Sequence, residues 1–555
     1  MIAAALVVGI FVLYVATYAS IPAGDGYWVL NNIDRNNLEL LFNPPSLLTQ
    51  LGFFALRRLA DALGLSIATL TIIQTVNALV AGVGAALLYG IARGLGGSRT
   101  VAVLTGALLA VSFGYWQFAN GELQLISLVV LLLIFWLIVR ARVRGAWSCW
   151  FVVGVGWLNA LAALLRQENV LFGLAAVALL CVGRPLRPAV RDALLYAVVG
   201  SIGTWTVAII LALAFVPLVH TVSDAGMWYV WVTGHIRSTQ DFQAFEYATK
   251  FDVPRVVKGQ LTALIIGTQA AVDAMRDHAM LVRSKVVGLM ALTTAAYAVM
   301  VILLADLSRV RRLRQTGLVT VAVASAAWIL GYKLVFHAWL WPSVTKYQVV
   351  TVPPLILLSV LGVIAAQKAA DGARPAWRLA LVASLVVVVF AVDLWGGILP
   401  WRRYGEMKDA LEARRVREFR ADDLYVSSES GIDPIFARLY RGGNAHHVSV
   451  KNAFRDMPTS KAFESIRAAI ARQLAHGGRV FVYNFVPSAY SLIAINQSPQ
   501  RAGTPLDARD FEAFFGELRT TYAVRPIFSY WEESKAPLYL FGERLEPFFE
   551  LSARS

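Results

Sequence analysis

Long apolar runs recur along the first 400 residues of the chain, separated by short polar segments. A run of about 20 apolar residues is long enough to cross a membrane as a helix. The first run lacks a basic segment before it and is long for a signal peptide, so we interpret it as a retained span. The pattern predicts about eleven transmembrane helices, expected near residues 1–20, 67–92, 101–118, 123–139, 147–165, 170–183, 193–217, 286–304, 317–336, 347–366 and 377–399.

Two longer polar segments interrupt this pattern. Residues 21–66 form the first loop, and within it residues 45–63 are apolar on one side only, which predicts a helix lying in the membrane interface. Residues 218–285 form a second polar and aromatic segment. Few ionisable groups stand at the centres of the predicted spans, because the charges gather at their ends.

The chain becomes far more polar after residue 400 and alternates between two periodicities. Strands are predicted at 424–428, 479–485, 523–532 and 537–543. Helices are predicted at 460–478, ended by glycine, and at 506–522, with Asp507 as the N-cap. This alternation predicts a small α/β domain over residues 401–555, following a transmembrane domain over residues 1–400.

Composition excludes an ordinary soluble protein. Of the 555 residues 58% are hydrophobic and only 15% are charged, whereas soluble domains carry about 25% charged residues. The net charge of +15 comes from arginines in short loops that all follow even-numbered spans. The positive-inside rule accounts for them without a nucleic-acid partner. It predicts a bacterial-type inner (plasma) membrane protein with a cytoplasmic N-terminus. The 21–66 loop, the 218–285 loop and the C-terminal domain are then periplasmic or extracellular.

Two carboxylates stand at the predicted outer face. Asp25 lies between Gly24 and Gly26 directly after the first span, and Glu122 lies in the turn between the third and fourth spans. A carboxylate held there can act as a general base toward an attacking hydroxyl. The alternatives are a solvated loop residue for Asp25 and a glutamate favoured by a helix dipole for Glu122.

Basic groups at the same face form the second set of candidates. Arg166, Gln167 and Glu168 make a short turn after the fifth span, and an arginine there runs against the positive-inside trend. Its planar fork can bind a phosphate or pair with a carboxylate, or it can extend to the interface. His337 and Lys346 flank a later turn, and His235 is a weaker candidate. No spacing of His and Glu matches a zinc motif, so no metal ligands are assigned, although a bound divalent metal stays open as a cofactor.

Three local patterns resemble the GT-C superfamily of membrane glycosyltransferases, in particular its protein O-mannosyltransferase-like and aminoarabinose-transferase-like members. The first is Gly24-Asp25 followed by Asn43-Pro44-Pro45, the second is Tyr115-Trp116-Gln117 before Gly121-Glu122, and the third is Trp341-Pro342 before Lys346-Tyr347. Many relatives have histidine at the position of Asn43 and an Asp-Glu pair at Asp25-Gly26.

The resemblance implies transfer of a sugar from a polyprenyl-phosphate donor to an acceptor hydroxyl on a glycan, lipid or protein of the cell envelope, with inversion. It implies Asp25 as the base, Glu122 as an orienting residue, and Arg166 and Lys346 as the cations at the leaving phosphate. Gln167, Glu168, His337, Asn43 and His235 are further candidates for binding the substrate. Three alternatives stay open at this stage: a lipid or glycan flippase, a polymerase or ligase of lipid-linked glycans, and a non-catalytic assembly protein.

Overall fold

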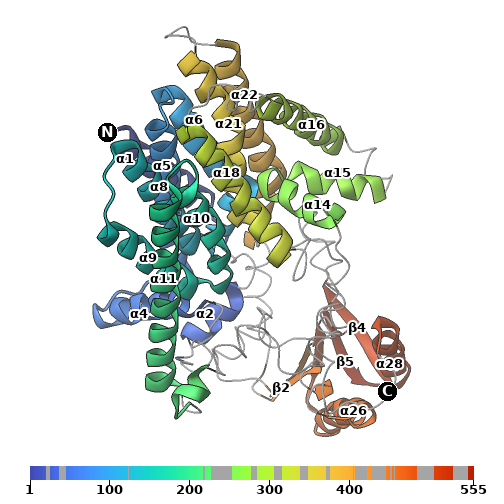
Figure 1. The fold of residues 1–555 in the computed structure, drawn as a ribbon. Coiled ribbons are helices and arrows are strands. Elements are labelled where there is room, and N and C mark those ends of the chain that lie inside the picture. The colour runs from blue at the N-terminus through green and yellow to red at the C-terminus, as the bar shows by residue number, and fades with distance from the viewer. Residues whose placement is uncertain are drawn as a thin grey trace. The chain divides into compact units, whose positions relative to one another are not determined.

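The computed structural model is mainly helical (Figure 1). The chain divides into two compact units, which we describe separately. The first is Met1–Gly26, Asn36–Arg237 and Phe245–Pro400, and the second is Tyr27–Arg35, Ser238–Ala244 and Trp401–Ser555. The structure describes residues 1–20, 26–34, 36, 46–122, 124–216, 219–226, 253–276, 284–305, 316–337, 348–369, 376–403, 405–406, 420, 422–427, 446–450, 453–454, 457–483, 485, 506–528 and 548–554.

Seven helices in the described part of the chain, some extended by an adjoining turn, are long and apolar enough to cross a membrane. They are α5 (Thr69–Gly94), α8 (Gln124–Arg144), α11 (Leu186–Phe215), α16 (Ser284–Ala305), α18 (Thr316–Gly331), α21 (Val352–Ala369) and α22 (Ala376–Asp393). Shorter apolar helices cover the other predicted spans: α1 (Ile2–Thr17), α6 (Arg99–Val111), α9 (Cys149–Leu165) and α10 (Gly173–Cys181), which follows the 3₁₀ turn η2 (Gln167–Phe172). A polytopic helical membrane protein is therefore confirmed, while the number eleven stays a prediction.

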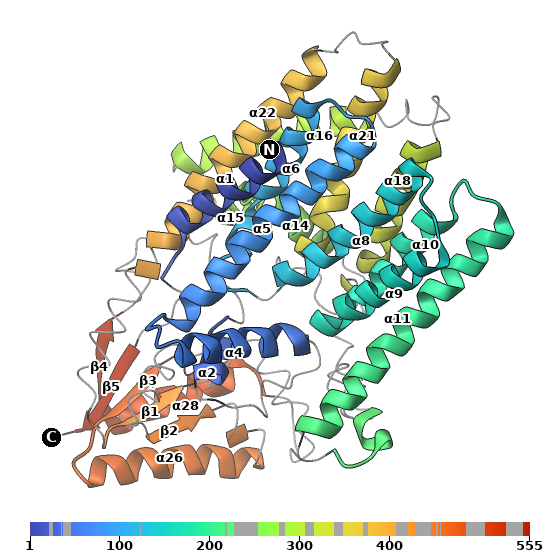
Figure 2. The ribbon, with the colours of Figure 1, turned by 90° about the vertical axis from the view of Figure 1, so that its left-hand side faces the viewer.

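Small residues let the helices of the first unit pack closely. Helices α1, α6 and α8 all contact α5 (Figure 2). A Cβ atom on Gly82 of α5 would lie 2.8 Å from the carbonyl oxygen of Val7 in α1. A Cβ atom on Gly106 of α6 would lie 2.7 Å from the carbonyl oxygen of Ala85. Such close backbone approach is the usual way in which membrane helices associate, because lipid gives them little hydrophobic drive to do so.

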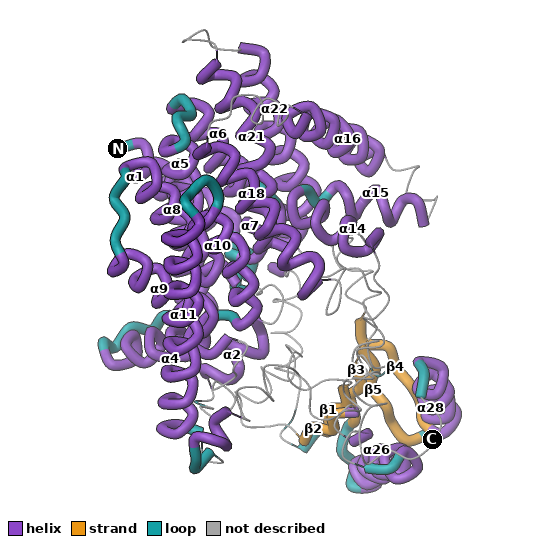
Figure 3. The backbone as a smooth tube through the Cα atoms, viewed as in Figure 1, coloured by secondary structure: helices purple, strands orange, loops and turns teal. Residues whose placement is uncertain are grey.

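Shorter helices occupy both long polar segments (Figure 3). Helix α4 (Leu47–Ala62) is the amphipathic helix expected at 45–63, and it exposes Leu56 and Leu59. The 218–285 segment holds α14 (Val253–Leu264) and α15 (Gly267–Arg276), which the sequence analysis did not assign. The backbone N–H of Ile266, just before α15, donates to the fully buried Asp393 Oδ1 at 2.8 Å. Asp393 thereby satisfies a donor at the start of α15 that would otherwise be buried without a partner.

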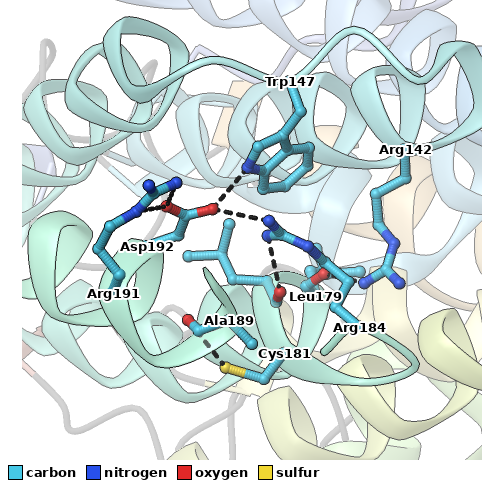
Figure 4. Close-up of polar contacts among 9 residues, drawn as sticks. Arg142, Trp147, Leu179, Cys181, Arg184, Ala189, Arg191 and Asp192 are labelled. Carbon is cyan, nitrogen blue, oxygen red and sulfur yellow. Dashed lines mark hydrogen bonds and ion pairs between the residues drawn. The ribbon is translucent and has the colours of Figure 1, made fainter. Parts of the chain in front are cut away.

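An arginine cluster ties the α8–α9 connection to the α10–α11 connection (Figure 4). Asp192, fully buried, accepts from Trp147 Nε1 at 2.7 Å and from Arg184 at 2.8 Å, and it also pairs with Arg191. Arg142 donates to the carbonyls of Leu179 and Val182 at the end of α10. Several arginines that the positive-inside rule places in the cytoplasm thus also hold helix ends together.

The second unit contains a five-stranded mixed sheet of order β2-β1-β3-β5-β4. Its strands are β1 (Leu424–Ser427), β2 (His446–Ser449), β3 (Val480–Tyr483), β4 (Tyr522–Phe528) and β5 (Phe548–Ala553). Helix α26 (Thr459–Ala475) ends before Gly477, whose φ is +73°, and α28 (Ala508–Thr521) begins with a capping box between Asp507 and Asp510. The unit also includes most of α2 (Gly26–Asp34). Both predicted helices, the N-cap and three predicted strands are confirmed, whereas 537–543 lies outside the described residues.

Candidate functional site

Asn120 joins the end of α1 to two other elements of the first unit. Its Oδ1 atom accepts from the backbone N–H of Ala19 at 3.1 Å and from Gln74 Nε2 of α5 at 2.8 Å. Gln74 Nε2 also donates to the carbonyl of Ala19 at 2.9 Å. All three residues are buried, so each bond satisfies a group that would be costly to leave unpaired. We call this set the Asn120 junction.

The junction brings the chain before Asp25 close to the turn that carries Glu122. Gly121 in this turn has φ +115°, a conformation that favours glycine. Asn77 Nδ2 donates to the backbone carbonyl of Glu122 at 2.8 Å, and Glu122 itself is only 1% exposed. Glu122 therefore lies inside the bundle, just before α8, and not on the solvated surface.

The aromatic residues of the sequence motif support the same turn. They lie in α7 (Phe113–Phe118), where Trp116 Nε1 donates to Thr17 Oγ1 of α1 at 2.9 Å. The ring of Trp116 stacks on Tyr14 with a centroid separation of 5.8 Å. Trp116 thus fixes α1 against the turn through ring packing and one hydrogen bond, whereas Tyr115 Oη donates to the carbonyl of Ala81 in α5 at 2.9 Å.

Arg166 and Glu168 form an ion pair of 2.5 Å between α9 and η2. Their side chains are only 10% and 11% exposed, so Arg166 does not extend into solvent. Next to them Asn169 Oδ1 accepts from Tyr332 Oη at 2.9 Å. Tyr332 begins the π-helix η5 (Tyr332–His337) at the end of α18. π-helical turns occur frequently at functional sites.

Lys333 is a candidate that the sequence analysis missed. Its partly buried ammonium donates to Gln348 Oε1, and among the described residues no carboxylate pairs with it. Gln348 is fully buried and precedes η6 (Val349–Thr351), where Thr351 Oγ1 donates to the carbonyl of Gln348 at 2.9 Å. A lysine inside a predicted span was the available signal, because an ionisable side chain in an apolar segment is usually functional.

The Glu122 turn, the Arg166–Glu168 pair and the Lys333–Gln348 pair lie at one end of the first unit. The link is Gly114 of α7, where a Cβ atom would lie 2.6 Å from Val349 of η6 and 3.1 Å from the carbonyl of Ala263 in α14. Helix α7 leads to Glu122, η6 follows Gln348, and η5 contacts η2 beside Arg166. We refer to Glu122, Arg166, Glu168, Asn169, Lys333 and Gln348 together as the polar rim.

Several predicted site residues cannot be placed. Asp25, Asn43, His235 and Lys346 lie outside the described residues, and His337 is described only as the last residue of η5. Gln167 begins η2 beside Arg166, and its Nε2 atom is buried without a hydrogen-bond partner. Among the residues that the structure describes, no three His, Cys, Asp or Glu side chains group as metal ligands would.

Comparison with known proteins gives one family match. Residues 59–219 match the family described as dolichyl-phosphate-mannose-protein mannosyltransferase. This segment runs from the end of α4 to just beyond α11, and it includes the Glu122 turn and the Arg166–Glu168 pair. No curated protein matches the chain.

Similar solved structures include two of the oligosaccharyltransferase of Archaeoglobus fulgidus. For the apo form the identity is 12%, the TM-score is 0.47, and the match covers 87% of this chain and 69% of that one. For the complex with zinc and sulfate the identity is 12%, the TM-score is 0.42, and the coverages are 86% and 68%. The match over residues 59–219 confirms the resemblance expected from the sequence, to the GT-C superfamily of membrane glycosyltransferases.

Proposed function

We propose that the protein transfers a sugar from a polyprenyl-phosphate donor to an acceptor hydroxyl at the outer face of a membrane. The observation that carries the proposal is the polar rim, which gathers a carboxylate at Glu122 and cations at Arg166 and Lys333 at one end of the helices. Glu122 and Arg166 both fall within the segment that is similar to the mannosyltransferase family. The acceptor is a glycan, lipid or protein of the cell envelope.

Asp25 is the general base of the proposed reaction. Ala19 is held by Asn120, and Asp25 follows it by six residues, so the chain can carry Asp25 at most about 20 Å from Ala19. The base takes the proton of the acceptor hydroxyl while the acceptor oxygen forms a bond to the anomeric carbon. Glu122, two residues after Asn120, orients the acceptor or the base.

The bond from the anomeric carbon to the phosphate oxygen breaks in the same step, with inversion at that carbon. The electron pair leaves with the polyprenyl phosphate, whose negative charge rises as it departs. Arg166, Lys333 and Lys346 stabilise this charge, and the low exposure of the Arg166 side chain strengthens its attraction to the phosphate. Gln167, Asn43, His235 and His337 complete the proposed substrate contacts, with Glu168 holding Arg166 in place.

The proposal is tested by Asp25→Asn in the purified full-length protein reconstituted in lipid. The probe is a polyprenyl-phosphate mannose with a labelled sugar, and release of polyprenyl phosphate is measured together with labelled product. Loss of a general base lowers turnover by about 10² to 10⁴-fold. Undiminished turnover with normal folding would remove Asp25 from the mechanism.

Asp61→Asn serves as the matched control. The Asp61 side chain is 39% exposed, and its one ion pair within the described part of the chain is with Arg57, one turn earlier on α4. An exposed pair of this kind contributes little to stability. The control variant is therefore expected to transfer sugar at the rate of the parent protein.

A further inference from the structure

A groove of about 360 Å³ opens between α5 and α8, outside the polar rim. Its walls include Gly90 and Gly94 of α5 and Trp136, Val139, Arg140 and Arg144 of α8. The two helices lie side by side over this stretch (Figure 2). The groove lies at the ends of both helices that the positive-inside rule assigns to the cytoplasm.

The glycines shape the groove in two different ways. A Cβ atom on Gly90 would lie 2.7 Å from Trp136 Nε1, so only a glycine lets the indole lie against α5. A Cβ atom on Gly94 would meet nothing within 4 Å, so the groove is open there. Leu79 and Val83 continue the same outward stripe of α5 and are 51% and 38% exposed. An exposed apolar stripe of α5 therefore leads toward the groove.

Two arginines supply positive charge at its end. Arg140 and Arg144 are one helical turn apart and share a face of α8. The guanidinium of Arg140 lies 4.8 Å above the centre of the Trp136 ring, which fixes it while leaving the N–H groups at its edge. Arg142, which lies between them in sequence, donates to the carbonyls of Leu179 and Val182 at the end of α10. Arg140 and Arg144 form no ion pair with any described residue. The sequence contains no Asp or Glu at 62–121 or 123–167.

We propose that this groove binds one anionic phospholipid, with its phosphate held by Arg140 and Arg144 and an acyl chain along Leu79 and Val83. Charge complementarity favours a phosphate over a neutral headgroup. Basic pockets between transmembrane helices at the cytoplasmic side are well suited to such headgroups. The groove and its arginines do not depend on the proposed transferase activity.

The test is native mass spectrometry of the full-length protein in detergent, titrated with phosphatidylglycerol or with phosphatidylcholine of the same acyl chains. The parent protein is expected to bind phosphatidylglycerol about tenfold more tightly, or more, because two arginines face the phosphate. The double variant Arg140→Gln and Arg144→Gln is expected to lose this preference. The variant Arg187→Gln, which changes an exposed arginine in the first turn of α11, is expected to retain it.

A second variant tests whether lipid binding needs the open space of the groove in addition to the charge of the two arginines. Gly94→Leu keeps both arginines, and its Cβ atom would meet nothing within 4 Å, so the added side chain takes up space in the open part of the groove. It is expected to weaken phosphatidylglycerol binding as strongly as the double arginine variant. Equal binding of both lipids by the parent protein, or full phosphatidylglycerol binding by Gly94→Leu, would overturn the proposal.

Discussion

Lys333 places an ammonium group near the end of an otherwise apolar helix, with a carboxamide as its partner. Removing an ammonium from water is costly unless a counter-charge is available. The described residues supply no carboxylate for it, whereas a bound phosphate would. In the proposed reaction this arrangement makes Lys333 a cation of the donor site.

We expect Lys333→Met to lower turnover with polyprenyl-phosphate mannose by about 10²-fold, the usual loss when one group that stabilises transition-state charge is removed. Lys333→Arg should restore part of it because the charge is retained. The measurement is kcat and KM for the donor. Lys285→Met, which removes an exposed lysine at the start of α16, is the control and should behave as the parent. An unchanged kcat for Lys333→Met would exclude Lys333 from the site.

At the level of single residues, the sequence identified candidate site residues that stand at unusual positions in the predicted topology. Arg166 at a predicted outer turn and Glu122 after an aromatic pair were both identified, and both are buried in the structure. Asn120, Gln74 and Asn77 were not identified because an uncharged amide in a span end carries no distinctive pattern. Their importance follows only from the hydrogen bonds that they form across the bundle.

Among the secondary-structure elements, α1 and α7 depend on each other through the Asn120 junction. We expect Asn120→Leu to leave the Ala19 N–H without a partner, a loss of about 1–3 kcal/mol in the free energy of unfolding. Turnover should fall further than this loss of stability explains, because the loop that carries Asp25 begins at the junction. Thermal unfolding and sugar transfer measured on the same sample check both parts.

Ser98→Ala is the comparison for this variant. Ser98 caps the start of α6, and its Oγ accepts from Val101 at 3.3 Å and from Gln367 at 3.1 Å. Loss of a cap costs about 0.5–2 kcal/mol, so the two variants should lose similar stability. Equal turnover in Asn120→Leu and Ser98→Ala would mean that the junction has only a structural role.

The elements with strong periodicity were predicted correctly, and those without it were not. The helices α26 and α28 follow from their amphipathic pattern and from Asp507. Strand β2 was missed because its sequence His-His-Val-Ser is largely polar. In the structure His447 Nε2 lies 3.0 Å from Ser427 Oγ of the neighbouring strand β1. Helices α14 and α15 were missed because they are short segments within a polar region.

For the whole molecule, the central prediction is orientation. We expect Cys149, which is exposed at the start of α9, to react with an impermeant maleimide only from the cytoplasmic side. A cysteine introduced by Ser460→Cys in α26, with both native cysteines replaced by serine, should react only from the outside. Labelling of intact cells and of inverted vesicles measures both. Reaction of both positions from the same side would contradict the predicted topology.

Hydropathy alone predicted that the chain is a polytopic membrane protein, but it did not predict which residues make up the polar rim. The polar rim forms because α7 packs on η6 and α14, and these contacts join residues more than a hundred positions apart. A single sequence gives no measure of such distant contacts. It identified the candidates Asp25, Glu122 and Arg166 but could not predict that Lys333 and Gln348 belong to the same end of the bundle.

The most direct test is a structure of the full-length protein with bound polyprenyl-phosphate mannose, prepared in the inactive Asp25→Asn variant. We expect the donor phosphate to contact Arg166 and Lys333, and residue 25 to lie within reach of the acceptor position. A phosphate bound away from both cations, for example only at Arg140 and Arg144, would contradict this expectation.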